Sequence, residues 1–84
     1  RRGEIDIVAM DGPVVVFVEV KRRLRQADAY EAVGRAKRES IMRTALDFLL
    51  RSAMLERPVR FDVISVDGNG LVCGHLRDAF EMTL

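Results

Sequence analysis

Four charged side chains stand in two short apolar segments near the start of the chain. The segment EIDIVAM carries Glu4 and Asp6, and the segment VVVFVEVK carries Glu19 and Lys21. Both segments have the alternation or the β-branched composition of strands. Because side chains alternate between the two faces of a strand, Glu4 and Asp6 share one face, and so do Glu19 and Lys21. The intervening MDGP contains the Asp-Gly signal of a tight turn, which predicts an antiparallel hairpin.

The register of this hairpin decides whether its carboxylates meet. A two-residue turn at 11–12 would pair Asp6 with Phe17, and a four-residue loop at 11–14 would pair it with Glu19. Either register places Asp6 on the side of Glu19 and Lys21. A slip of one residue would place them on opposite faces.

A cluster of Asp6, Glu19 and Lys21 has a defined chemistry. Two neighbouring carboxylates repel, and their burial costs several kcal/mol unless a cation compensates it. Oxygen ligands with open positions suit Mg²⁺ or Mn²⁺, which lower the pKa of bound water and polarise phosphoryl groups. Lys21 could orient that water and stabilise charge on a phosphate oxygen. These residues predict phosphodiester hydrolysis; the alternative is an exposed ion-pair patch at the strand ends.

Basic residues are concentrated after this hairpin. Residues 21–43 hold eight Lys or Arg against three acids, whereas the whole chain has a net charge of +1. Such a segment predicts a polyanion partner, and the alternative is a solvated helix face. The candidates for salt-dependent phosphate contact are Arg22, Arg23, Arg25, Arg35, Lys37 and Arg38.

The remaining pattern predicts one α/β domain with a helix across a mixed sheet. Residues 59–66 form a third strand, residues 71–76 a weak strand, and residues 77–84 a short terminal helix. The main helix follows an Asp28–Glu31 capping box and runs to about Leu55, with a break at Gly34 as an alternative. Arg60 and Asp62 share a face of the third strand, where an ion pair is expected, and His75 is expected to cap or pack.

The sequence lacks both a membrane-spanning segment and a second cysteine, and both absences bear on where the protein is located. It contains no run of about 18 apolar residues, so no membrane span is expected. Cys73 is the single cysteine, which excludes an internal disulfide and indicates a reducing cytoplasm.

The combination EID…FVEVK…RFDV resembles the PD-(D/E)xK nuclease motif, with Asp6 and Glu19-Val20-Lys21 at the motif positions. Over nearly its whole length the chain resembles the YraN-like family of small bacterial proteins, which are related to restriction endonucleases and Holliday-junction resolvases. The resemblance implies that Asp6, Glu19 and the Val20 carbonyl bind the metal. It also implies that Lys21 serves the attacking water and that Glu4 is an additional or second-layer acid.

The resemblance also implies a restriction-endonuclease-like core of α-β-β-β-α-β order. Residues 1–84 then form a single endonuclease-like domain of order β-β-α-β-(β)-(α), which begins at the second core strand. On this resemblance the preceding helix and first strand would be absent from residues 1–84, which would leave a sheet edge exposed and the site incomplete. Ile5 stands where the motif has proline, and Arg22 replaces the usual Thr or Ser.

The sequence therefore predicts a cytoplasmic, Mg²⁺- or Mn²⁺-dependent nuclease with DNA as the favoured substrate. One alternative is a nucleic-acid-binding protein without turnover that assists DNA uptake, repair or recombination. The other is a protein-interaction or dimerisation module, and a homodimer is a further option for the assembly.

Overall fold

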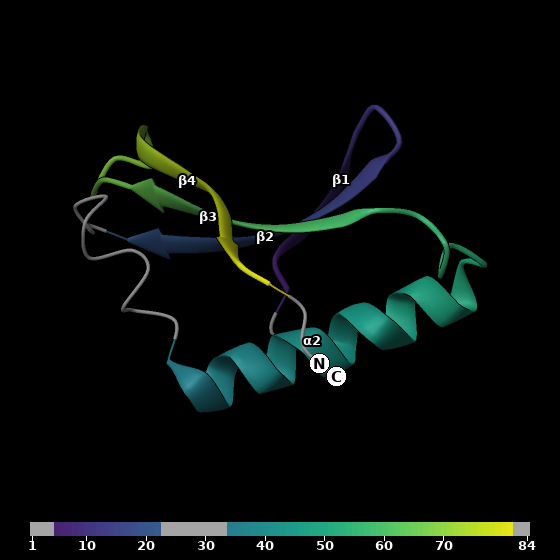
Figure 1. Cartoon of the computed structure of the whole chain (residues 1–84). Coiled ribbons are helices and arrows are strands. Elements are labelled where there is room, and N and C mark those ends of the chain that lie inside the picture. The colour runs from purple at the N-terminus through teal and green to yellow at the C-terminus, as the bar shows by residue number, and fades with distance from the viewer. Residues whose placement is uncertain (1–4, 23–33, 82–84) are drawn as a thin grey trace.

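The structure, a computed structural model, describes residues 5–22 and 34–81. Its elements are β1 (Ile7–Asp11), β2 (Val14–Arg22), α2 (Arg35–Arg51), β3 (Val59–Val66) and β4 (Val72–Phe80). The strands form one sheet, and α2 runs across one of its faces (Figure 1). This arrangement confirms the predicted α/β class with a mixed sheet and a single long helix.

The sheet has the order β1-β2-β3-β4, so β2 and β3 are its central strands. β1 and β4 pair antiparallel with their neighbours, whereas β2 and β3 pair in parallel. A parallel pair requires a long crossover connection, and α2 belongs to the connection between β2 and β3. All five residues of β1 are exposed, and among the described strands β1 pairs with β2 alone.

The β1–β2 hairpin turns through Gly12 and Pro13. Ile7 pairs with Val18 and Asp11 pairs with Val14, which is the register predicted for the longer loop, reached here with a loop of two residues. Gly12 has a φ of +60°, as the first central position of a type II′ turn requires, and the left-handed region favours glycine. The predicted turn at 11–12 is thus displaced by one residue.

The core lies between α2 and the face of β2 and β3 that it covers. Phe17 of β2 and Phe61 of β3 have stacked rings with centroids 5.6 Å apart, and Phe80 of β4 stacks on Phe61 at 4.8 Å. α2 contributes residues at helical spacing to the same cluster: Ile41, Met42, Ala45 and Leu49. Phe48 of the same helix packs against this cluster.

The structure corrects two element boundaries. α2 ends at Arg51, four residues before the predicted end, and Ala53 with a φ of +56° follows it. The predicted capping box at residues 28 and 31 lies outside the described residues. Residues 77–80 belong to β4 and not to the predicted terminal helix, because their pairing with β3 continues through a bulge in which Asp78 has a φ of +55°.

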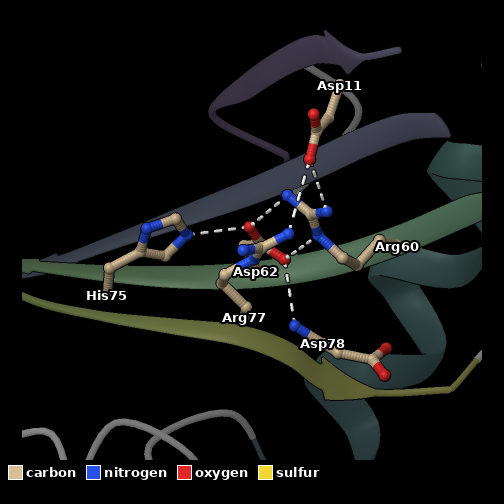
Figure 2. A network of polar contacts seen from close by, with 6 residues as sticks. All are labelled: Asp11, Arg60, Asp62, His75, Arg77 and Asp78. Carbon is tan, nitrogen blue, oxygen red and sulfur yellow. Dashed lines mark hydrogen bonds and ion pairs between the residues drawn. The ribbon is translucent and has the colours of Figure 1, made fainter. Parts of the chain in front are cut away.

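Asp62 holds this bulge from the face of the sheet opposite α2 (Figure 2). Its side chain is 1% exposed and accepts the Asp78 backbone N–H at 3.0 Å. Arg60 donates to both carboxylate oxygens, from Nε at 2.9 Å and from Nη2 at 3.1 Å, and His75 Nε2 lies 2.8 Å from Oδ2. The expected Arg60–Asp62 ion pair is confirmed, and His75 is one of its partners.

Arg60 also connects β3 to the hairpin. Its Nη1 donates to Asp11 Oδ2 at 2.9 Å, and Arg77 Nη2 lies 3.4 Å from the same oxygen.

The hydrogen bond and charge of Arg60 hold the pKa of Asp11 below its ordinary value. Burial would raise the pKa of Asp62, but the hydrogen bonds from Arg60, the Asp78 N–H and His75 outweigh burial and lower this pKa as well. Both carboxylates therefore stabilise the folded sheet in their ionised form.

Candidate functional site

Glu19 is a buried carboxylate near the carboxyl end of β2. It follows Phe17 on the face that α2 covers, and it is 6% exposed. Two ammonium groups contact its Oε2 atom: Lys21 Nζ at 3.2 Å and Lys37 Nζ at 3.1 Å. Lys21 lies two residues further along the same strand, whereas Lys37 comes from the first turn of α2. The structure thus brings Glu19 and Lys21 together as predicted and adds Lys37 to them.

The other carboxylate oxygen of Glu19 has no such partner among the described residues. Oε1 is buried and accepts no hydrogen bond from any described residue. A buried acceptor without a partner costs about 1–3 kcal/mol, so such atoms commonly face a ligand, an ion or a water. Oε1 is therefore the atom of this cluster that is best suited to receive a cation.

Ser65 of β3 extends the cluster to the neighbouring strand. It pairs with Lys21 in the parallel register, so the two side chains share the face that α2 covers. Ser65 is 1% exposed, and its buried Oγ likewise has no hydrogen-bond partner among the described residues. Sequence analysis did not identify Ser65, although its alternation with Phe61 and Val63 in RFDVISV could have placed it on the core face.

Asp6 approaches the cluster from the edge of the sheet. Its N–H donates to the Val18 carbonyl at 3.1 Å, and its Oδ2 accepts the Val20 N–H at 2.9 Å. These bonds depart from the regular ladder, which ends at Ile7, so Asp6 lies against the β2 backbone instead of in a regular pair with Glu19. The N–H and C=O of one strand residue point to the same side, so the Val20 carbonyl points toward β1.

The other predicted site residues are distributed more widely. Arg22 is the exposed last residue of β2, and Arg38 is half-buried in the first turn of α2. Arg35 begins α2, but its side chain lies outside the described part of the chain. Glu4, Arg23 and Arg25 also lie outside it. Lys37, for which contact with phosphate is predicted, contacts Glu19.

The donor set suits a hard divalent cation. Asp6 and Glu19 would supply carboxylates and Val20 would supply a carbonyl, and Mg²⁺ prefers one or two carboxylates completed by water and phosphate. Among the residues that the structure describes, no group of three His, Cys, Asp or Glu side chains could hold a metal. Any such cation would therefore depend on water, on phosphate or on residues beyond the described ranges for its remaining ligands.

A mixed sheet covered by one helix, with a carboxylate–lysine cluster at the end of its central strands, defines a small α/β protein with a candidate metal site. The model of the uncharacterised protein family UPF0102 matches residues 1–66. The chain belongs to this family, which confirms the resemblance to the YraN-like proteins.

Curated relatives extend the match along the chain. A UPF0102 protein of Anaeromyxobacter sp. (strain Fw109-5) is 46% identical over 68 residues, which cover 79% of this chain and 51% of that protein. A UPF0102 protein of Geotalea uraniireducens (strain Rf4) is 39% identical over 85 residues, covering 95% of this chain and 67% of that protein. One of Geobacter metallireducens is 42% identical over 86 residues, covering 98% and 70%. This chain thus spans between about half and about 70% of the length of these relatives.

Within the described part of the chain, no helix has the length and apolar character needed to cross a membrane. This finding agrees with the hydropathy pattern of the sequence.

Proposed function

We propose that this chain carries the metal-binding site of a nuclease that hydrolyses phosphodiester bonds, with DNA as its substrate. The buried and unpartnered Glu19 Oε1 supports this proposal most directly, because it is an anionic oxygen placed beside Lys21 without a hydrogen-bond donor from the described residues. The contact of Asp6 with the Val20 N–H adds a second carboxylate next to the same peptide segment.

Each residue has a separate role in this proposal. Asp6, Glu19 and the Val20 carbonyl hold Mg²⁺ or Mn²⁺, which when bound polarises the phosphoryl group and acidifies water. Lys21 positions the attacking water and stabilises negative charge that develops on a phosphate oxygen. Its side chain is 23% exposed, so a nucleic-acid strand at the end of β2 can reach it.

Cleavage assays with the full-length protein test this function. Single-stranded, duplex, flapped and four-way-junction DNA are incubated with the protein in Mn²⁺ and in EDTA, beside Lys21→Gln and the control Arg51→Gln. Arg51 is an exposed basic residue on α2 that pairs with Asp47, away from Glu19. We expect cleavage that requires metal, is lost in Lys21→Gln and persists in Arg51→Gln. Cleavage that survives Lys21→Gln would refute the assigned mechanism.

A second candidate function is nucleic-acid binding without turnover. Two lysines on Glu19 Oε2 already compensate its charge, as expected of a carboxylate with a structural role. The first turn of α2 also contains Arg35, Lys37 and Arg38 but no acid, an arrangement that the helix dipole disfavours and a bound phosphate would compensate. Salt-dependent DNA binding without metal-dependent cleavage would support this alternative.

A further inference from the structure

Lys37 and Lys21 bring two positive charges to one buried carboxylate oxygen. Both Nζ atoms lie within 3.2 Å of Glu19 Oε2, so they are also close to each other and repel. The side chain of Glu19 is 7% exposed, so solvent screens this repulsion only weakly. A divalent cation arriving at Glu19 would add a third positive centre to the same small volume.

The two lysines differ in how firmly the fold holds them. Lys21 lies inside the β2–β3 ladder, where it pairs with Ser65. Lys37 lies in the first turn of α2, its side chain is 33% exposed, and the N-cap residue Gly34 provides no side-chain hydrogen bond to that turn. A lysine ammonium on a flexible four-carbon stem can leave a carboxylate by changing rotamers, without movement of the backbone. Lys37 is therefore the cation that can leave Glu19 more readily.

We propose that Lys37 is an internal counter-ion that occupies Glu19 until a divalent cation binds, and that it then turns toward nucleic-acid phosphate. This inference rests on the metal site of the proposed function, but it does not require cleavage. It makes Lys37 a positioning residue, which holds the Glu19 side chain in place while the site holds no metal. Its ammonium and the metal compete for one carboxylate, so they oppose each other's binding.

A purely structural role for Lys37 predicts a different behaviour. If its ion pair only ties α2 to β2, removal of the ammonium disorders Glu19 and weakens metal binding. If Lys37 competes with the metal, removal of the ammonium strengthens metal binding even though the metal-free protein becomes less stable. The sign of the change in metal affinity separates the two roles.

The first experiment titrates the full-length protein with Mn²⁺ by calorimetry, without nucleic acid, and measures thermal unfolding in EDTA. The variants are Lys37→Gln, Lys37→Arg and the control Arg43→Gln, which removes an exposed basic residue from the same helix. We expect Lys37→Gln to bind Mn²⁺ roughly tenfold more tightly, about 1.4 kcal/mol, and to melt at a lower temperature in EDTA. Lys37→Arg and Arg43→Gln should bind Mn²⁺ as the parent protein does.

Unchanged or weaker Mn²⁺ binding by Lys37→Gln would overturn the proposal, as would the absence of Mn²⁺ binding by both this variant and the parent protein. Tighter binding by Lys37→Gln in a protein that cleaves no DNA would support the Lys37 inference and reject the nuclease function. The two conclusions are therefore distinguishable.

The second experiment tests the contact with phosphate. The affinity for duplex DNA is measured against salt concentration, with and without Ca²⁺ as a cation that occupies oxygen sites. One additional phosphate contact steepens the slope of log Kobs against log salt by about 0.9. We expect this steepening upon Ca²⁺ addition in the parent protein and not in Lys37→Gln. Equal slopes in both proteins would refute the movement of Lys37 toward phosphate.

Discussion

Replacement of Asp62 by asparagine tests whether the network on the face of the sheet opposite α2 determines the stability of the fold. Asp62 accepts hydrogen bonds from Arg60, from the Asp78 N–H and, in the appropriate tautomer, from His75 (Figure 2). Asparagine is nearly isosteric and retains one acceptor for the Asp78 N–H. Its amide has no charge, however, and it presents N–H donors toward groups that are themselves donors.

The expected decrease in the free energy of unfolding follows from the burial of Asp62. Removal of one partner from a buried ion pair costs about 3–5 kcal/mol. Arg60 retains Asp11 as a partner and its side chain is 17% exposed, so the lower limit, about 3 kcal/mol, applies here. At the usual 0.05–0.15 kcal/mol per residue, 84 residues account for a stability of only about 4–13 kcal/mol. The substitution should therefore lower Tm by roughly 12–24 °C.

Thermal and urea unfolding measure this change, with Asp47→Asn as a matched control. Asp47 forms an i,i+4 ion pair with Arg51 on the surface of α2, with side chains 62% and 79% exposed. The same chemical substitution at this exposed pair should cost less than about 0.5 kcal/mol. A loss below 1 kcal/mol in Asp62→Asn, or equal losses at the two positions, would show that the network is not a major source of stability.

Three further predictions concern pH, the site and the hairpin. The pKa values of Asp11 and Asp62 are lowered in the folded state, so their stabilisation is complete above about pH 3.8 and is lost as pH falls through the folded-state values. Acid unfolding monitored by circular dichroism should show this loss, and Asp62→Asn should reduce its slope. Glu19→Gln should abolish the stabilisation of the protein by Mn²⁺ in thermal melts, and retained stabilisation would place the metal elsewhere. Gly12→Ala should lower the free energy of unfolding in urea by about 1 kcal/mol. No atom of the described residues lies within 4 Å of the added Cβ, so only the φ of +60° opposes the substitution. A decrease above about 2 kcal/mol would contradict this explanation.

The central part of the fold could be predicted from sequence because its signals are local. The β-branched composition of VVVFVEVK predicted a strand, and β2 forms there with residues 15–19 buried. Apolar residues at helical spacing in α2 likewise meet the sheet. Glu19 and Lys21 could be placed together because strand alternation alone determines their common face.

The parts that sequence did not predict depend on contacts between distant segments. Residues 77–80 have no strong strand pattern, and they extend β4 because a bulge held by Asp62 accommodates them. In the sequence Lys37 looks like any charged residue on a solvated helix face. Only the packing of α2 on β2 brings its ammonium to Glu19. Ser65 enters the site through the parallel register of two strands that are separated by a helix.

β3 contributes to both polar clusters, with Asp62 in the network and Ser65 beside Lys21 in the Glu19 cluster. Val18 pairs with Asp62, and the next pair in the register joins Glu19 to Val63. Because successive side chains alternate faces, the Asp62 network lies on one face of β2 and β3 and the Glu19 cluster on the other.

In the network every described carboxylate oxygen of Asp62 has a donor, whereas in the cluster Glu19 Oε1 and Ser65 Oγ have none among the described residues. A satisfied network stabilises, and an unsatisfied buried cluster costs stability and retains the capacity to bind. The face of the sheet opposite α2 therefore supplies rigidity to strands whose other face, against α2, holds the atoms that are available to a ligand.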